Sequence, residues 1–168
     1  MVEHRADIVQ CLIGMRIFGF MADDLSRLER ILPLLNLRHY RSGETVIEEG
    51  AVGDSLFIVL SGRVRIVKHT SDQDAYTVII LEEKDHGFFG EICLLQNSRR
   101  TASVVCEEDS SFLELRRRDF EQLCHIDPYL GMMIYREIAK ILAERLRKTD
   151  EDVITLFNAL VSEVEGNT

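Results

Sequence analysis

Hydrophobic positions at the start of the chain recur at helical spacing. Ile8, Leu12 and Met15 follow one another at intervals of four and three residues, which keeps them on one face of an α-helix. A second stripe of the same period follows, and Pro33 ends or kinks it because proline lacks a backbone N–H. We therefore predict N-terminal helices over residues 1–34.

Between residues 35 and 116 the apolar positions alternate with polar ones instead. The segments predicted as strands are 44–48, 55–60, 63–69, 76–81, 102–106 and 111–115. Glycines and short polar runs, such as residues 71–74, separate them as turns. Short strands in this number and at this spacing are typical of an antiparallel sandwich, roll or barrel.

The helical period returns after the last strand. Phe120 and Leu123 indicate a short helix, which Asp127-Pro128 interrupts. A long helix follows, with apolar residues on one side at Leu130, Met133, Ile134, Ile138, Ile141, Leu142 and Leu146. The pattern predicts two C-terminal helices over residues 117–149.

The last segment, residues 150–168, carries a second apolar seam. Its members are spaced four, three and four residues apart, at Val153, Phe157, Leu160 and Val164. Residues 149–152 either cap a new helix or form a polar turn of one continuous helix. The seam packs on its own domain or joins two chains, so a homodimer through the C-terminal helices is one of two interpretations.

Composition places the chain among ordinary globular proteins. Its 168 residues are 46% hydrophobic and 29% charged, which suits one domain with a real core. The longest apolar runs, such as 56–60, have about five residues, whereas a membrane helix needs about 20. With no signal peptide at the N-terminus, we expect a cytoplasmic protein with no membrane partner.

The cysteines form no C-x-x-C pair and are expected as free, mostly buried thiols.

The net charge of −9 argues against a general nucleic-acid surface, because phosphate binding needs clustered Lys and Arg. If the ligand is an anion, a local feature must reverse the field of the protein. Residues 88–104 supply such a feature. Arg100 can grip a phosphate with two parallel hydrogen bonds, and Thr101 adds a hydroxyl.

The first part of that segment has complementary chemistry. Gly90 lets the backbone approach a bulky group, and residues 91–95 can form one helical turn whose free N–H groups favour an anion. Glu91 is out of place beside an anion unless it accepts a hydrogen bond from a hydroxyl, such as a ribose 2′-OH.

Residues 88–104 resemble the phosphate-binding cassette of the cyclic-nucleotide-binding domain family. The family pattern is F-G-E-(aliphatic)-(small)-L followed by R-(small or Thr)-A-(Ser/Thr)-V, and residues 89–94 and 100–104 fill it in order. Residues 50–64 are similar to the family's hairpin, with glycines at its turns. The resemblance covers about residues 20–148, and it is nearest to the cyclic-nucleotide-gated and hyperpolarisation-activated channel branch. The chain departs from many members at Cys93, where Ala is usual, and at Arg99, where Pro is frequent.

The resemblance implies an α+β fold: an antiparallel, jelly-roll-like β-roll flanked by N-terminal helices and by C-terminal B and C helices. It also implies that Arg100 neutralises a cyclic phosphate, with the N–H groups around Ile92 and Cys93 and the Thr101 hydroxyl sharing its oxygens. Glu91 would take the ribose 2′-OH. The ligand-binding residues expected in this way are Phe89, Gly90, Glu91, Ile92, Cys93, Arg100, Thr101 and Ala102.

The base is less well defined by the sequence. Ile66 and Ile80 are expected to point into the roll, either as base contacts or as plain core. The family closes its C helix over the base, and simple spacing puts Ile141 and Arg145 near that lid. We expect no cofactor and a ligand that is cAMP or cGMP; cAMP is the default, although Thr101 can hydrogen-bond a syn guanine.

Other functions fit less well. A cupin enzyme shares the roll but needs a His-x-His metal cluster, and the five histidines here are isolated, so we expect no catalytic residues and no metal. Catabolite-activator-type regulators add a helix-turn-helix of roughly 60 residues after the C helix. Only about twenty residues follow Lys148, and their net charge is negative, so we expect no nucleic-acid partner. A degenerate roll that only pairs subunits has no need of Gly90, Glu91 and Arg100 together.

The sequence thus predicts a cyclic-nucleotide sensor, a regulatory domain that passes occupancy of its pocket through the C helix. Whether the signal reaches a partner protein, a separate transcription or effector subunit, or a dimer rearrangement stays open at this point.

Overall fold

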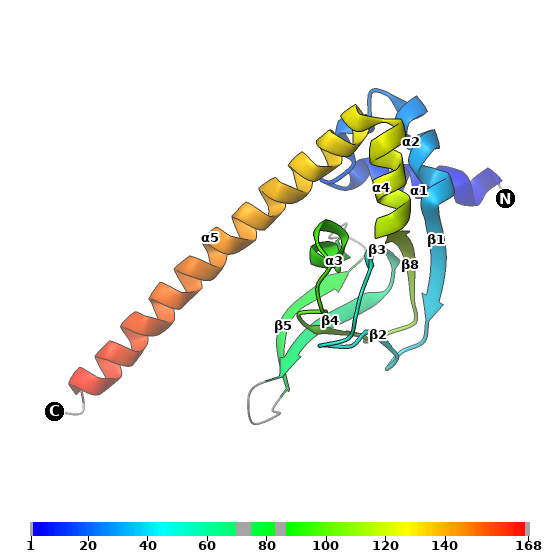
Figure 1. Cartoon of the computed structure of the whole chain (residues 1–168). Helices are drawn as coiled ribbons and strands as arrows, with labels where there is room; N and C mark the ends of the chain where they lie inside the picture. Colours follow the sequence, from blue (N-terminus) through cyan, green and yellow to red (C-terminus); the bar gives the residue numbers. More distant parts are fainter. Residues whose placement is uncertain (1, 70–74, 83–86, 167–168) are drawn as a thin grey trace.

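The strands of the protein form two antiparallel sheets with helices gathered at one end (Figure 1). The computed structural model describes residues 2–69, 75–82 and 87–166. The first sheet has the order β1-β8-β3-β6, with β1 (Leu35–Tyr40), β8 (Ser110–Arg116), β3 (Ser55–Ser61) and β6 (Phe88–Phe89). The second has the order β2-β7-β4-β5, with β2 (Thr45–Ile47), β7 (Ser103–Cys106), β4 (Arg63–His69) and β5 (Ala75–Glu82). The predicted β-roll flanked by helices is confirmed.

The N-terminal helices close one end of the roll. They are α1 (Val2–Gly14), α2 (Leu25–Ile31) and two 3₁₀ turns, Gly19–Met21 and Leu32–Leu34. Together with the C-terminal helices they bury the larger of two apolar clusters, which includes Leu12, Met15, Phe18, Ile31, Phe120 and Ile134. Burial of this size fixes the helical end of the domain as one packed unit.

A smaller cluster fills the interior of the roll. Phe57 and Phe89 stack with ring centroids 5.4 Å apart, and Phe112 meets the Phe89 ring edge-on at 5.5 Å. Val59 and Val64 are fully buried beside them. Edge-to-face and offset stacking of this kind stabilises aromatic pairs beyond the contribution of their buried area. These three rings therefore form a well-packed interior for the roll.

Strand β5 contains an irregularity that changes which of its side chains face inward. Ile66 pairs with Ile79, yet Val67 pairs with Thr77, so Val78 is an extra residue on β5. An extra residue shifts the alternation by one position. Ile80 lies in the regular part of the ladder and pairs with Arg65, between the inward-facing pairs Val64–Leu81 and Ile66–Ile79. It therefore faces the outside of the roll, and the prediction that it points inward is wrong.

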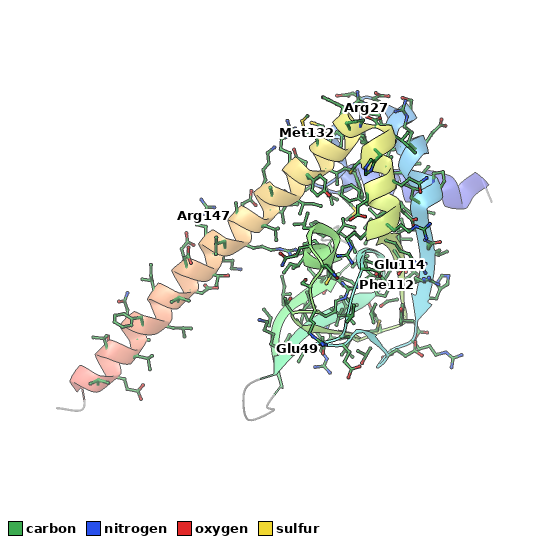
Figure 2. The ribbon with its side chains drawn as sticks, viewed as in Figure 1. Arg27, Glu49, Phe112, Glu114, Met132 and Arg147 are labelled. Carbon is green, nitrogen blue, oxygen red and sulfur yellow. The ribbon has the colours of Figure 1, made fainter. Side chains whose placement is uncertain are left out.

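The C-terminal helices are α4 (Arg117–Ile126) and α5 (Pro128–Gly166). The Asp127 carboxylate accepts a hydrogen bond from the Leu130 N–H at 3.0 Å and thereby caps α5, whose first residue is proline. Helix α5 runs through residues 149–152 without a break, so the polar stretch is a turn of one continuous helix of 39 residues. Its first half packs on α4 and on the helical end of the domain, and its second half extends away from the roll (Figure 1, Figure 2).

Several further expectations can be compared with the fold. The turn predicted at 71–74 lies outside the described residues. None of the four cysteines forms a disulfide; Cys93 and Cys106 are buried, while Cys11 and Cys124 are half-buried. No described helix combines the length and the apolar character that a bilayer crossing requires.

Candidate functional site

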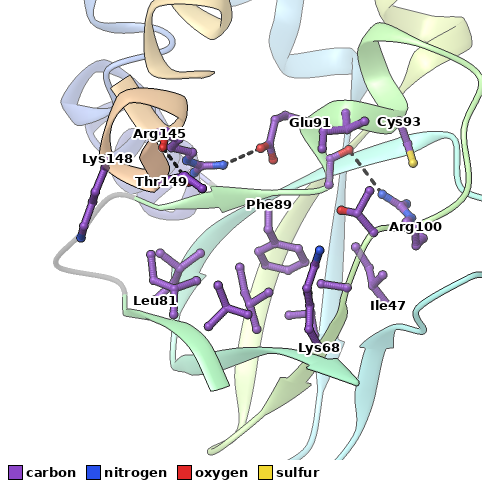
Figure 3. A pocket seen from close by; sticks show the side chains of 18 of the residues that line it. Ile47, Lys68, Leu81, Phe89, Glu91, Cys93, Arg100, Arg145, Lys148 and Thr149 are labelled. Carbon is purple, nitrogen blue, oxygen red and sulfur yellow. Dashed lines mark hydrogen bonds and ion pairs between the residues drawn. The ribbon is translucent and has the colours of Figure 1, made fainter. Parts of the chain in front are cut away.

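A cavity of about 340 Å³ opens between the second sheet, the segment 88–104 and helix α5. This volume lies in the range of pockets that hold small ligands, about 300–1,000 Å³. The carboxylate of Glu91 and the guanidinium of Arg100 both lie in its wall (Figure 3). All eight predicted ligand-binding residues line the cavity: Phe89, Gly90, Glu91, Ile92, Cys93, Arg100, Thr101 and Ala102.

Arg100 lies at the inner end of the cavity and is only 8% exposed. One terminal nitrogen of its guanidinium, Nη1, donates to the Ser55 carbonyl at 2.7 Å and to the Gly90 carbonyl at 3.3 Å, while Nη2 donates to Ser55 Oγ at 3.2 Å. Every one of these acceptors is neutral. Among the described residues no carboxylate forms an ion pair with it, so a buried positive charge is oriented but not neutralised.

Two glycines make room for that guanidinium. Gly90 has a φ of +81°, which side chains rarely adopt, and a Cβ there would stand 2.5 Å from Arg100 Nη1 and 2.8 Å from the Ser55 carbonyl oxygen. At Gly53 a Cβ would stand 2.0 Å from Arg100 Nε. Arg100 can therefore occupy its place only because both positions lack a side chain.

The backbone on either side of Arg100 is held by the loop that contains Gly53. The Arg100 N–H donates to the Ala51 carbonyl at 2.8 Å, and the Gly50 N–H donates to the Arg100 carbonyl at 2.9 Å. Arg99 is exposed and donates from Nη1 to the Gly50 carbonyl at 2.7 Å. Neighbouring arginines thus differ in role: Arg99 braces the loop from outside, and Arg100 points into the cavity.

The single helical turn α3 (Glu91–Leu95) forms the upper wall of the cavity (Figure 3). The Cys93 N–H donates to the Gly90 carbonyl at 3.2 Å within this turn, and the Cys93 thiol donates to the Ser98 carbonyl at 3.5 Å. Because the first residues of a helix have no preceding turn to accept their hydrogen bonds, the N–H groups of Glu91 and Ile92 stay available to a ligand.

Glu91 is 6% exposed, and its carboxylate pairs with the guanidinium of Arg145 on α5 (Figure 3). The Arg145 guanidinium also lies over the Phe88 ring, 5.4 Å from its centroid. This contact joins α5 to the part of the cavity where Glu91 would meet a hydroxyl. The predicted position of Arg145 beside the cavity is therefore observed, in a contact that spacing alone does not specify.

The residue before Arg145 is held from the other side. Arg16 donates two parallel hydrogen bonds to the Glu144 carboxylate, at 2.7 and 2.8 Å. These hydrogen bonds and the positive charge of Arg16 hold the pKa of the Glu144 carboxyl below its usual value. Two adjacent residues of α5 are thus tied to opposite parts of the domain, the N-terminal region and α3.

The remaining predicted contacts divide into two groups. Ile66 lines the cavity, as expected. Ile80 faces outward, because it pairs with Arg65, and does not line the cavity. Ile141 is 7% exposed and packs in the helical core rather than on the cavity. Among the described residues, the first residue of α5 that lines the cavity is Arg145.

The cavity also has lining residues that the sequence interpretation missed. From α5 these are Lys148, Thr149 and Asp152, which lie three, four and seven residues after Arg145 and so share its helix face. From the strands they include Lys68, two residues after Ile66 and therefore on the same face of β4, together with Val78, Ile79 and Leu81. Both sets could have been found by continuing each period from a residue already chosen.

Charge distribution in the cavity is opposite to that of the chain. Its lining contains the cations Lys68, Arg100, Arg145 and Lys148 and the anions Glu91 and Asp152, an excess of two positive charges in a chain of net charge −9. A local positive field of this kind attracts an anion. Across residues 2–69, 75–82 and 87–166, no group of His, Cys, Asp and Glu is arranged to hold a metal ion.

Comparison with known proteins agrees with this geometry. The family model for the cyclic nucleotide-binding domain matches residues 37–127, more than half of the chain. The chain belongs to the cyclic nucleotide-binding domain family. A cGMP-dependent protein kinase of Drosophila melanogaster, isozyme 2 forms cD5/T2, is 34% identical over 122 residues, 71% of this chain and 13% of the kinase.

Two matches come from one bacterium. The cyclic AMP receptor protein of Thermus thermophilus is 34% identical over 114 residues, 67% of this chain and 50% of the receptor. The crystal structure of the Thermus thermophilus catabolite activator protein superposes with a TM-score of 0.71 and 29% identity, covering 82% of this chain and 62% of that one. This cyclic nucleotide-binding domain thus spans half or less of the length of the two curated relatives.

Proposed function

We propose that this domain is a cyclic-nucleotide sensor that binds cAMP or cGMP and transmits occupancy of the pocket through α5. The observation that carries the proposal is the buried, unneutralised guanidinium of Arg100, in the same cavity as the buried carboxylate of Glu91. A cyclic nucleotide supplies one partner for each: an anionic phosphate for Arg100 and a 2′-hydroxyl for Glu91.

The phosphate belongs at the inner end of the cavity. There the guanidinium of Arg100, the free N–H groups at the start of α3 and the Thr101 hydroxyl surround one position. A cyclic phosphodiester carries a single negative charge, which one guanidinium neutralises. The domain needs no catalytic group for this task, and we propose that it regulates rather than catalyses.

Transmission follows from the double use of Glu91. Its carboxylate pairs with Arg145 through Oε1, and a ribose hydroxyl would be a second hydrogen-bond partner of the same carboxylate. Nucleotide therefore changes the contact that joins α5 to α3. A ligand can shift the equilibrium between two helix positions only by the difference in its interaction free energy with each of them. Its effect on the Glu91–Arg145 pair is one source of such a difference.

The distal half of α5 offers a surface to which a partner that receives the signal could bind. The exposed large apolar side chains that share one face of this half are Val153, Phe157, Leu160 and Val164. Successive residues of an α-helix are 100° apart, so the face that lines the cavity, Arg145 to Asp152, is offset from this stripe by about a quarter turn. Folding α5 onto the roll therefore does not bury the stripe.

We propose that a second copy of the helix covers this stripe. Sedimentation measures the oligomeric state of the wild type and of Phe157→Asp, and a monomeric wild type refutes the proposal.

Calorimetry of the purified domain with cAMP and with cGMP tests the binding proposal. Replacing Arg100 by Ala removes a charge-assisted, bidentate contact and is expected to cost about 2–4 kcal/mol, or about 30- to 1,000-fold in affinity.

Arg99→Ala is the matched control, because Arg99 is exposed and points to the Gly50 carbonyl. It is expected to cost under about 1 kcal/mol. Equal losses in the two variants would contradict the assignment of the phosphate to Arg100, and no binding of either nucleotide to the wild type would refute the function.

A further inference from the structure

Lys68 is the one strand cation that lines the cavity, among otherwise apolar strand residues. It comes from β4, points into the cavity and is half-buried (Figure 3). Its neighbours on the floor are Ile47, Ile66, Leu81 and Phe89. Within the described part of the chain, no hydrogen bond or ion pair engages the Lys68 ammonium.

The strand register gives Lys68 a definite place. Val67 pairs with Ser103 across β4 and β7, so Lys68 lies beside Ala102, the residue that precedes β7. Paired residues of neighbouring strands are about 5 Å apart, and Ala102 follows Thr101 directly. Lys68 is therefore on the sheet side of the cavity, across from α3 and Glu91.

A bound nucleotide would cover Lys68 and remove water from it. An ammonium has three donors and no acceptor, and burying it without a partner is costly. The described residues around it offer apolar side chains, and the single charge of a cyclic phosphate is already matched by Arg100. We assign the acceptor to the part of the ligand that lies over the apolar strand residues beside Lys68, which is the base.

The two candidate bases differ in what they offer to a donor. Guanine carries two adjacent acceptors, O6 and N7, which is why Lys and Arg are its commonest partners. Adenine carries N7 beside an N6 amino group, and that amino group is itself a donor. A donor-only side chain therefore favours guanine and leaves adenine with a donor facing a donor.

Resting on the proposed function, we infer that Lys68 selects the base and that the domain prefers cGMP to cAMP. The ammonium donates to guanine O6 and N7 when the nucleotide is bound. The preference is set from the sheet, by a residue outside the segment 88–104 that holds phosphate and ribose.

Calorimetry with three nucleotides tests this on the wild-type chain. We expect cGMP to bind about 10-fold or more tightly than cAMP, the worth of a charge-assisted hydrogen bond. Cyclic IMP keeps O6 and N7 but lacks the 2-amino group, and we expect it to bind within about threefold of cGMP. Cyclic IMP binding as weakly as cAMP would overturn the inference, because another residue would then read the 2-amino group.

Variants locate the effect. Lys68→Met keeps the length and apolar stem and is expected to lose about 10-fold in cGMP affinity, with cAMP changed by less than about threefold. Lys68→Arg retains the donors and should retain the preference. The control is Arg65→Met on the same strand, since Arg65 lies on the other face with Val67; it should change neither nucleotide.

Each outcome is distinct from failure of the proposed function. Equal losses for both nucleotides in Lys68→Met would mean that Lys68 serves the phosphate, and the inference fails while the sensor stands. Equal affinity of cAMP and cGMP for the wild type also overturns the inference alone. Absence of binding by all three nucleotides removes the proposed function itself.

Discussion

The two ends of the cavity are built in different ways. At the inner end, Gly90, Glu91 and Arg100 come from one short stretch of chain, and Arg100 is held by neutral oxygens before any ligand arrives. At the outer end, the lining comes from β4, β5 and α5, which are far apart in sequence, and residues such as Val78, Ile79, Lys148 and Asp152 are exposed.

This difference separates affinity from response. A preorganised end costs little to occupy and supplies most of the binding free energy. An end assembled from a strand pair and a long helix can change its geometry, and its contacts with a ligand are the ones that can bias two helix positions. On the proposed function, we expect the inner end to recognise what all cyclic nucleotides share, and the outer end to distinguish the base and report occupancy.

The largest effect is expected from breaking the inner end. Gly90→Ala puts a Cβ at 2.5 Å from Arg100 Nη1 and at a φ of +81°, so the guanidinium must move. We expect a loss of at least about 100-fold in nucleotide affinity, measured by calorimetry.

Gly43→Ala is the control for backbone strain alone. Gly43 also has a positive φ, +84°, but nothing lies within 4 Å of its Cβ position. The substitution should lower the stability of the fold by about 1 kcal/mol and leave affinity unchanged. A Gly90→Ala protein that keeps its affinity would show that Arg100 is not fixed before binding.

An intermediate effect is expected at the outer end of the cavity. Ile79 lines the cavity and Ile80 faces away from it, although the two are adjacent and equally exposed at 43%. Ile79→Ala should weaken nucleotide binding by about 1 kcal/mol through lost apolar contact. Ile80→Ala should change binding by less than about 0.5 kcal/mol. The reverse ranking would restore the inward position of Ile80 that the sequence predicted.

The smallest effect on affinity is expected at the contact between the two ends. Arg145 is 44% exposed in its side chain, so its pair with Glu91 contributes no more than about 1 kcal/mol. Arg145→Ala should change nucleotide affinity by less than about fivefold. Hydrogen exchange should nevertheless change clearly: in the wild type we expect nucleotide to protect residues 133–146 as well as the segment 88–104, and in the variant the protection of the helix should be lost. Wild-type protection confined to 88–104 would leave a passive binding module.

The structure alters one experiment that the sequence suggests. Cutting the chain after about Leu130 looks suitable for removing the lid while keeping the roll. However, Ile134, Ile138 and Ile141 belong to the helical core, so that truncation exposes buried apolar surface. Ending the chain after Arg147 keeps those residues and removes the outer lining from Lys148 onward together with the exposed apolar stripe.

The inner end of the cavity was predictable from the sequence because its chemistry is local. Gly90, Glu91 and Arg100 lie within eleven positions of one another, and each has one residue type that suits its task. Gly53 was not recognised as part of the site, because its need for a missing side chain comes from Arg100, a contact between distant parts of the chain.

The outer end was less predictable for a different reason. The register of β5 against β4 decides which isoleucine faces inward: Ile79 pairs with Ile66, and Ile80 pairs with Arg65. Residues 78–80 are an unbroken β-branched run, whose lack of alternation leaves that register undefined in the sequence. Lys68, near the end of a strand next to polar residues, has the pattern of a solvated side chain. Strand β6 has only two residues, Phe88 and Phe89, too few to produce a period.

The continuity of α5 gives the domain a mechanical property. A helix rises about 1.5 Å per residue, so Arg145 lies about 26 Å from the capped start at Pro128, and the far end at Gly166 lies about 57 Å from it. If the helix pivots at Asp127-Pro128 as a stiff rod, each ångström gained or lost at Arg145 becomes about two at the C-terminal end. Under the proposed function, such a pivot would make the domain a lever with a gain of about two: its short arm would end beside the nucleotide pocket, and its long arm would carry the exposed apolar stripe.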